Sequence, residues 1–184
     1  MLPRRYLKFN QTSKILNNYS KVKNKSIEHI IPKSYVGKNN IICYDIHNLL
    51  LWNKNLNQKR KNYKYKNLND NFELLDLQGN YTDKKNYFTT KIDFHNKLCE
   101  PLDRDKGIIA RSISYSIFTY NLMFLVPKLI DIETLLSWHI DFPVKEFEYK
   151  RNILINQVQG NENIFISQNE KLLLNYIQKI YIDK

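Results

Sequence analysis

Short apolar stretches alternate with polar residues in the first half of the chain and predict strands. A proline closes the first of these stretches, and a QGN turn at residues 78–80 separates the last two. The predicted strands lie within residues 26–32, 40–51, 72–77 and 87–94. Between the second and the third, the asparagines, a leucine and basic residues of 53–61 favour a short helix.

The second half of the chain has a different period. After Pro101, apolar residues recur at spacings of three and four, which is typical of helices. The predicted helices cover residues 108–124, 132–139, 144–159 and 169–181. A strand-containing half followed by a helical half predicts an α+β fold. No long polar linker separates the halves between residues 101 and 107, so we expect one domain over residues 1–184.

Basic residues are concentrated in the first third of the chain. The 184-residue sequence has a formal net charge of +11; residues 1–66 contain 15 basic and 2 acidic side chains, and residues 67–184 contain 14 and 16. Such a localised positive field favours a polyanionic partner, and nucleic acid is the partner we predict. In residues 53–66, lysines alternate with tyrosines, a mixture suited to phosphate contacts and base stacking. The contacts predicted there are Lys59, Lys61, Tyr63, Lys64 and Tyr65. A solvated basic helix end is the alternative.

Other classes of protein are excluded by what the sequence lacks. No apolar run reaches the roughly 18 residues of a membrane span, so no membrane partner is expected. Four glycines are too few for a glycine-rich nucleotide loop, and two cysteines exclude a disulfide framework. Residues 1–20 contain no apolar leader, so we expect an intracellular or viral protein, or a secreted one if the N-terminus is truncated.

Polar side chains that suit phosphodiester hydrolysis occur in clusters within the basic half. They are EH at residues 28–29, DIHN at 45–48 and NQKRKN at 57–62. Hydrolysis needs a base for water, a divalent cation on the phosphate and a positive side chain for the developing charge. Histidine, a carboxylate with an amide oxygen, and arginine can supply these parts. The alternative for His29 is an ordinary histidine at a strand end.

Five short motifs, in order, resemble the endonuclease I family. They are EHIIP from Glu28, DIHNL from Asp45, N-x-x-R-x-N from Asn57, P-x-x-x-x-K-G-x-x-A-R from Pro101 and QGNEN from Gln159. Members of that family are nonspecific nucleases of the ββα-metal, or His-Me finger, superfamily. The resemblance covers residues 26 to about 166. It implies a ββα-metal core at about 26–62 and a helical part at about 105–182.

The resemblance also implies a role for each matching residue. Glu28 and Asn57 correspond to metal ligands, and His29 to the general base that activates water. Arg60 is expected at the catalytic centre, and Asn62 on the same segment is expected to contact nucleic acid. The residues expected to brace the second strand and the helix are Asp45, His47 and Asn48.

The implied reaction is hydrolysis of DNA, and of RNA as an alternative, with little sequence specificity and 5′-phosphate products. The implied cofactor is Mg²⁺, with Mn²⁺ or Ca²⁺ as alternatives, because oxygen ligands suit all three ions. A monomer is the expected oligomeric state.

The sequence departs from the family near the expected site. Relatives commonly carry an insertion between the EH and DxHN motifs, with an arginine that supports the scissile phosphate. Here residues 30–45 join the two motifs, and the cations available to contact nucleic acid are Lys33 and Lys38. Relatives often have a carboxylate that orients the histidine two positions before Asp45, where this chain has Cys43. These departures favour a second hypothesis, a catalytically impaired nucleic-acid-binding protein of the same fold.

A zinc site is a further alternative. Cys43 with His47, and His95 with Cys99, have the spacing of tetrahedral ligand pairs. We favour free thiols in the core over this site. The side chains expected in the core are Cys43, Cys99, Trp52 and Trp138.

Overall fold

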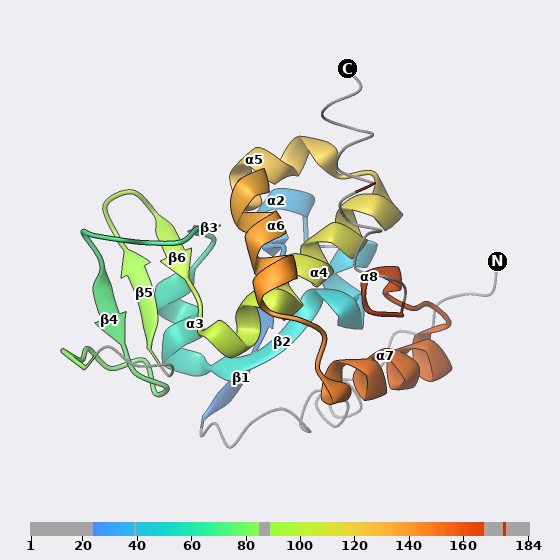
Figure 1. The fold of residues 1–184 in the computed structure, drawn as a ribbon, viewed down its shortest axis with the longest axis horizontal. Helices are drawn as coiled ribbons and strands as arrows, with labels where there is room; N and C mark the ends of the chain where they lie inside the picture. Colours follow the sequence, from blue (N-terminus) through green and yellow to red (C-terminus); the bar gives the residue numbers. More distant parts are fainter. Residues whose placement is uncertain (1–23, 39, 85–88, 168–174, 176–184) are drawn as a thin grey trace.

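The computed structural model describes residues 24–38, 40–84, 89–167 and 175 (Figure 1). Within these residues, the chain forms a two-stranded sheet, a four-stranded sheet and a set of helices that pack around one long helix. This architecture is the α+β class that the sequence predicts.

The two-stranded sheet is followed directly by a short helix. Strand β1 (Lys25–His29) pairs antiparallel with β2 (Leu49–Asn53), and Glu28 lies opposite Leu50. Helix α3 (Lys54–Arg60) begins at once because the Asn53 side chain accepts hydrogen bonds from the amides of the first turn, at 2.8 and 3.4 Å. The helix buries Leu56 and Arg60, one turn apart, on its inner face.

The connection between β1 and β2 is mostly helical turns. It contains helix α2 (Lys33–Val36) and two 3-10 turns, η1 (Ile41–Tyr44) and η2 (Ile46–Asn48). The side chains of Asn40 and Asp45 cap the two turns by accepting the amides of Ile42 and His47. The strand predicted over residues 40–51 is therefore wrong for its first part, because two capping side chains favour turns over extended backbone there.

The second sheet has the strand order β3-β6-β5-β4. Its strands are β3 (Lys64–Tyr65), β4 (Glu73–Leu75), β5 (Thr90–Asp93) and β6 (Leu98–Glu100). β4 and β5 confirm the strands predicted within residues 72–77 and 87–94. The QGN turn is also confirmed: Gly79, with φ +77°, donates its amide to Asp76 at 2.9 Å.

Helix α4 (Asp103–Tyr120) runs through the middle of the molecule (Figure 1), and every residue from Asp105 to Ile117 is buried. Around it lie η3 (Met123–Leu125), α5 (Val126–Leu129), α6 (Ile132–Asp141), α7 (Glu146–Gln159) and α8 (Ile164–Ser167). α4, α6 and α7 confirm three of the predicted helices. The fourth, residues 169–181, lies outside the described residues except for Asn175.

Gly107 allows α4 to approach the end of α6 closely. A Cβ atom at this position would lie 2.3 Å from the carbonyl oxygen of Phe142 and 2.6 Å from the Arg111 guanidinium. Arg111 in turn donates to that same carbonyl at 2.9 Å and pairs with Glu148 of α7 at 2.7 Å. The K-G-x-x-A-R motif therefore joins α4, α6 and α7.

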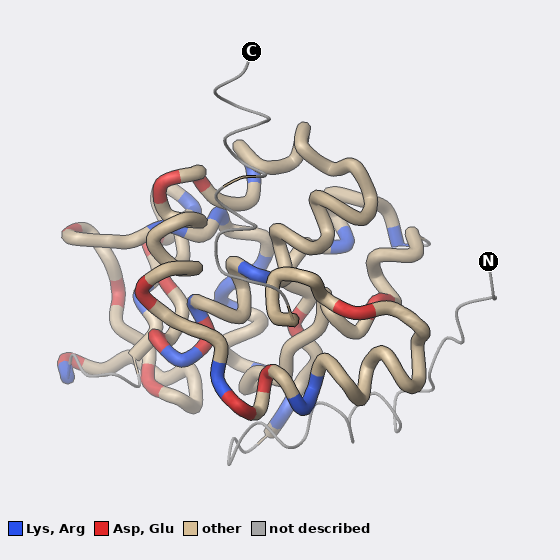
Figure 2. Tube along the Cα trace, turned by 45° about the vertical axis from the view of Figure 1, so that its right-hand side comes forward, with Lys and Arg blue, Asp and Glu red and all other residues tan. Residues whose placement is uncertain are grey.

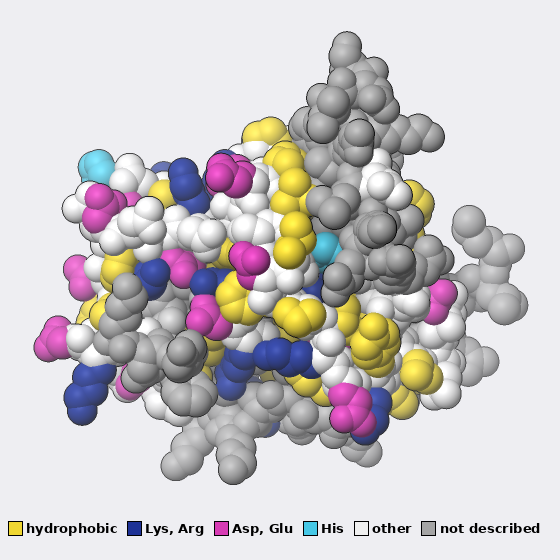
Figure 3. Space-filling model, in the orientation of Figure 1, with side chains coloured by type: hydrophobic (Ala, Val, Ile, Leu, Met, Phe, Trp, Pro, Cys, Tyr) yellow, Lys and Arg dark blue, Asp and Glu magenta, His cyan; other side chains and the backbone are white. Residues whose placement is uncertain are grey.

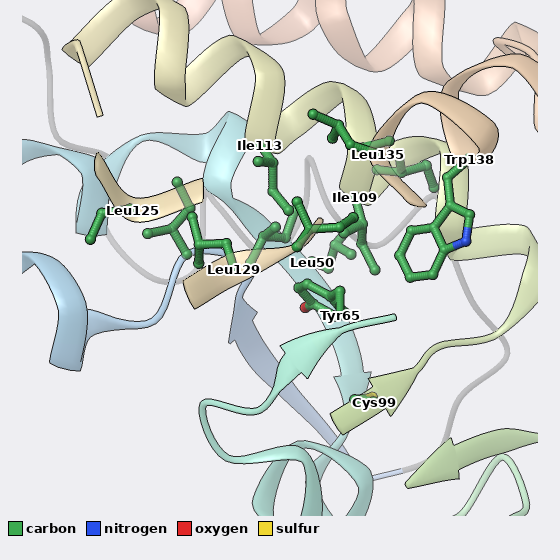
Figure 4. Close-up of a cluster of buried hydrophobic side chains, with 14 of the residues drawn as sticks. Leu50, Tyr65, Cys99, Ile109, Ile113, Leu125, Leu129, Leu135 and Trp138 are labelled. Atoms are coloured by element: carbon green, nitrogen blue, oxygen red, sulfur yellow. The ribbon is translucent and has the colours of Figure 1, made fainter. Parts of the chain in front are cut away.

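One hydrophobic cluster includes side chains from both sheets and from the helices. Figure 4 shows Leu50 of β2 and Tyr65 of β3 beside Ile109 and Ile113 of α4, with Trp138 of α6 at one side. The buried side chains confirm the core positions predicted for Trp52, Trp138 and the free thiols Cys43 and Cys99.

The surface carries charged and apolar side chains. Blue and red segments in Figure 2 are mixed over the described elements. Figure 3 shows apolar groups over α6 and α7, where Ile140, Tyr149, Ile153 and Leu154 are exposed. Among the described residues, no helix combines the length and the apolar character needed to cross a bilayer.

Candidate active site

His29 ends β1 and is held by the backbone of the following connection. Its Nε2 atom lies 3.1 Å from the carbonyl oxygen of Cys43. A carbonyl only accepts hydrogen bonds, so Nε2 carries the proton and Nδ1 is the basic nitrogen of the neutral ring. Burial, with the positive charges of Lys33 and Arg60, lowers the pKa of His29 to about 4. The side chain is therefore neutral at pH 7 and can accept a proton through Nδ1.

Glu28, the neighbour of His29, points into the protein interior and is 2% exposed. Its Oε1 atom forms an ion pair with the guanidinium of Arg60. Burial raises the pKa of Glu28 to about 7, although Arg60 acts in the opposite direction. Among the described residues, Arg60 contacts Oε1 of Glu28, which leaves Oε2 as the oxygen considered for a metal.

Arg60 does not face solvent. Besides the pair with Glu28, it donates to the carbonyl oxygens of His29 and Ile30, both at 3.2 Å, and its side chain is 1% exposed. The guanidinium also lies 4.3 Å from the ring centre of Tyr65. A direct catalytic role for Arg60 does not fit this burial. In this geometry it is a positioning residue that holds Glu28 and the backbone around His29.

Asn57 lies on α3 and reaches across to β1. Its Nδ2 atom donates to Ser26 Oγ at 3.0 Å and to the carbonyl oxygen of Ile27 at 2.9 Å. Both amide hydrogens are thus used, and the amide oxygen Oδ1 has no partner among the described residues. The strand residues that hold Asn57 directly precede Glu28, so the two predicted metal ligands come from neighbouring segments.

The donor set of Glu28 and Asn57 suits a hard divalent cation. A carboxylate oxygen and an amide oxygen are typical ligands of Mg²⁺, Mn²⁺ or Ca²⁺, with waters completing the coordination. No group of three or more His, Cys, Asp or Glu side chains able to hold a metal occurs within residues 24–38, 40–84, 89–167 and 175. The alternative zinc site is therefore wrong: Cys99 is fully buried, whereas His95 is exposed.

The DIHN segment joins the two ends of the β1–β2 connection. Asn48 is fully buried; its Oδ1 accepts the amide of Ile31 at 2.7 Å, and its Nδ2 donates to the carbonyls of Ile31 and Ile42. His47 is also fully buried and packs its ring 4.6 Å from that of Tyr115. All of these contacts are with other parts of the protein, as a bracing motif requires.

Asp45 is the centre of a buried hydrogen-bond network. Burial alone would raise the pKa of Asp45, but nearby His47 and donated hydrogen bonds lower it. Gln159 Nε2 and Asn161 Nδ2 donate to its carboxylate at 2.8 and 3.2 Å. The other donors are the hydroxyls of Tyr115 and Tyr120 and the amide of His47. The QGNEN motif thus binds the DIHN motif directly.

The predicted nucleic-acid contacts differ in exposure. Lys33, Lys38, Lys61 and Asn62 are exposed, and Lys64 is half-buried. Lys59 is half-buried as well, because it donates to the carbonyl oxygen of Gly79 at 2.8 Å. The charge of Lys33 acts on the pKa of His29, which places Lys33 near the candidate base.

Tyr63 and Tyr65 do not form a stacking surface. They are 7% and 0% exposed, and their rings pack edge-on against Phe94 and Trp138. The predicted base stacking by both residues is therefore wrong. Alternating residues of a strand point to opposite faces, so the tyrosines enter the core while Lys64 lies on the other face.

The residue that orients His29 could not be identified from side-chain chemistry. Cys43 stands where relatives often have an orienting carboxylate, but its backbone carbonyl makes the hydrogen bond. The Cys43 thiol itself donates to the carbonyl of Gly37 at 3.3 Å. No sequence signal marks a backbone acceptor, because every residue type has one.

Comparisons with known proteins identify the family of the chain. Residues 4–170 match the family model described as Endonuclease I. The chain is 34% identical over 122 residues to Endonuclease-1 of Buchnera aphidicola subsp. Acyrthosiphon pisum (strain APS), which covers 66% of this chain and 44% of the relative. It is 33% identical over 124 residues to Endonuclease-1 of Buchnera aphidicola subsp. Baizongia pistaciae (strain Bp), covering 66% and 45%. The chain thus spans less than half the length of these relatives. Because the family model matches most of its length, the chain belongs to the endonuclease I family.

Proposed function

We propose that this protein is a metal-dependent endonuclease that hydrolyses phosphodiester bonds in DNA, and in RNA as an alternative substrate, with little sequence specificity. The observation that carries the proposal is the orientation of His29. Its Nε2 donates to the Cys43 carbonyl, so Nδ1 carries no proton and can accept one. Membership of the endonuclease I family supports the same activity. The β1–β2–α3 unit is, in this proposal, the ββα-metal finger.

His29 acts as the general base. Its Nδ1 takes a proton from water, and the resulting hydroxide attacks phosphorus while the bond from phosphorus to the 3′ oxygen breaks. The leaving 3′ oxygen takes a proton from solvent, so the products are a 3′-hydroxyl and a 5′-phosphate. A pKa of about 4 keeps the base form populated at neutral pH. The low pKa also makes the ring a weak base, so its contribution depends on the placement that the Cys43 carbonyl provides.

Glu28 and Asn57 would hold one divalent cation through Oε2 and Oδ1. When bound, such a cation polarises the phosphate and stabilises the leaving oxygen. Arg60 fixes the Glu28 carboxylate, and Ser26 with the Ile27 carbonyl fixes the Asn57 amide, so the two oxygens are oriented before a cation arrives.

Lys33 replaces the missing phosphate-binding arginine in this proposal. It is exposed at the first position of α2, and its charge acts on His29. Lys38 is exposed too but has no such influence on the base. Nucleic acid is the proposed partner, and the remaining exposed cations, Lys61 among them, attract its backbone.

A plasmid-nicking assay tests the proposal. We expect the purified protein to relax supercoiled plasmid in Mg²⁺ and to stop in EDTA. His29→Ala should lower the rate by about two to four orders of magnitude, the usual contribution of a general base, with the folded circular-dichroism spectrum retained. His95→Ala is the matched control, because this histidine is exposed and outside the site. End-labelling should detect 5′-phosphates.

Two outcomes would reject parts of the proposal. Equal cleavage by the parent protein and His29→Ala would exclude His29 as the base. Plasmid binding without cleavage, in every divalent metal tried, would favour the catalytically impaired nucleic-acid-binding protein instead.

A further inference from the structure

Tyr81 is an exposed aromatic residue on a turn that packs against α3. Its side chain is 62% exposed, whereas Tyr63 and Tyr65 are buried. It follows the QGN turn and pairs by a single bridge with Leu75 of β4. An aromatic ring that remains this exposed contributes little to the core, and its surface is accessible to a ligand.

The turn that carries Tyr81 is closed by backbone hydrogen bonds. The Asp76 carboxylate accepts the backbone amides of Gln78 and Asn80 at 2.8 and 2.9 Å, and the amide of Thr82 donates to Leu74 at 3.0 Å. These bonds close the turn on both sides of Gly79. The ring of Tyr81 therefore starts from a fixed backbone.

The same turn is attached to α3. A Cβ atom at Gly79 would lie 2.7 Å from the amide nitrogen of Leu56, so only glycine permits this approach. Asn55 Nδ2 donates to the carbonyl oxygen of Gln78 at 3.2 Å. Lys59 donates to the Gly79 carbonyl and places its ammonium 3.8 Å from the centre of the Tyr81 ring. The ammonium lies over one ring face, so the opposite face is the one available for stacking.

We propose that Tyr81 is a stacking platform for an unpaired base of the nucleic-acid substrate, on a turn that packs against the helix carrying Asn57. This inference rests on the proposed nuclease function and adds a substrate preference to it: a single-stranded segment beside the cleavage site. Base stacking on an aromatic side chain is tolerant of sequence, because every base has a π-face.

The platform and the metal-binding side chain lie on different sides of α3. Lys59, which contacts the Tyr81 ring, and Asn57 are two residues apart on α3 and therefore differ by about 200° in direction. A helix with its side chains is about 10–12 Å across. The stacked base is therefore not the one at the cleaved bond.

Charge around Tyr81 argues for stacking over phosphate binding. The Asp76 carboxylate is occupied by the amides of the turn, and Asp83, two residues after Tyr81, is exposed and negative. Lys59 is the positive group at the ring itself. The contribution of Tyr81 to binding should therefore change little with salt, unlike that of the exposed lysines.

The test measures binding without cleavage. In a His29→Ala background with EDTA, fluorescence anisotropy compares a labelled 12-nucleotide oligo(dT) with a 12-base-pair duplex. We expect Tyr81→Ala to weaken oligo(dT) binding by at least about fivefold, the low end of aromatic stacking, and duplex binding by less than about twofold. Tyr81→Phe keeps the ring and should bind oligo(dT) within about twofold of the parent.

Phe124→Ala is the matched control. Phe124 is 69% exposed and follows the C-terminal end of α4. The opposite, N-terminal end of α4 is the one near α3, because Asp105 there accepts a hydrogen bond from Trp52 of β2. This variant should leave both affinities unchanged. Equal oligo(dT) binding by the parent and Tyr81→Ala would overturn the platform, as would equal losses for single strand and duplex. If the parent bound neither ligand, the proposed function would fail together with the platform; if it bound and only Tyr81→Ala had no effect, the platform alone would fail.

Discussion

The buried ion pair between Arg60 and Glu28 predicts a large and specific loss of stability when one partner is removed. Arg60→Met keeps most of the side-chain volume but leaves the Glu28 carboxylate buried without a cation. Breaking a buried pair in this way costs about 3–5 kcal/mol. The carbonyls of His29 and Ile30 also lose a donor, so the loss should lie toward the upper end.

The assay is thermal and urea unfolding of the metal-free protein. For a chain of this size, each kcal/mol corresponds to about 2–4 °C, so Arg60→Met should lower the Tm by roughly 6–20 °C. Adding Glu28→Gln removes the unpaired charge and should restore a large part of the lost stability. The metal binding proposed for Glu28 should not return, because the carboxylate is gone. Arg104→Met is the control, since Arg104 is partly exposed and its Asp105 contact is a looser 3.7 Å.

A small effect would refute this reasoning. If Arg60→Met changed the free energy of unfolding by less than about 1 kcal/mol, the pair would contribute no more than a surface salt bridge. If Glu28→Gln gave no recovery in the double variant, the loss would come from the orphaned carbonyls or from packing, and the charge argument would be wrong.

Three further predictions concern the scaffold. Gly107→Ala should lower the Tm, although alanine favours helices, because its Cβ would collide with the Phe142 carbonyl; a Tm above that of the parent would contradict this. Asp45→Asn places an NH₂ group against the donors of Gln159 and Asn161 and should lower the free energy of unfolding by about 2–3 kcal/mol. Urea titration measures this loss, and an unchanged free energy of unfolding would exclude the network as a brace. Burial raises the pKa of Asp105 to about 6, so the folded protein favours the protonated carboxyl more than the unfolded chain does. The free energy of unfolding should therefore be highest below about pH 4 and fall as the pH rises through 6. Asp105→Asn, measured at several pH values, should remove roughly 3 kcal/mol of pH dependence, and an unchanged slope would refute the shift.

Local patterns were sufficient to predict several elements. Helix α3 follows from Asn53, a capping residue before Leu56, and α6 and α7 follow from apolar spacing. The core positions of Trp52 and Trp138 follow from their apolar neighbours, and both indoles donate to polar partners, the buried Asp105 and the exposed Asn67. These features depend on nearby residues, and nearby residues are what a sequence pattern records.

The errors arose where distant residues decide the outcome. Tyr63 and Tyr65 alternate with lysines, a period of two that is itself typical of a half-buried strand, but the mixture was interpreted as a nucleic-acid surface. Arg60 lies one turn after Leu56 on the inner face of α3, yet its burial requires Glu28, which is 32 residues away. Tyr81 carries no motif, and its position beside Lys59 depends on how the QGN turn docks on α3.

The network around Asp45 has a consequence for synthesis of the chain. Gln159 and Asn161 reach Asp45 from 114 and 116 positions further along the sequence. While a ribosome is still making residues 1–158, the β1–β2–α3 unit can emerge, but the turn that holds the Cys43 carbonyl against His29 lacks its brace. A nascent chain should therefore remain without an ordered candidate site until nearly all of the described fold has been translated. For the proposed nuclease, this order of events would delay cleavage until Gln159 and Asn161 have folded onto Asp45.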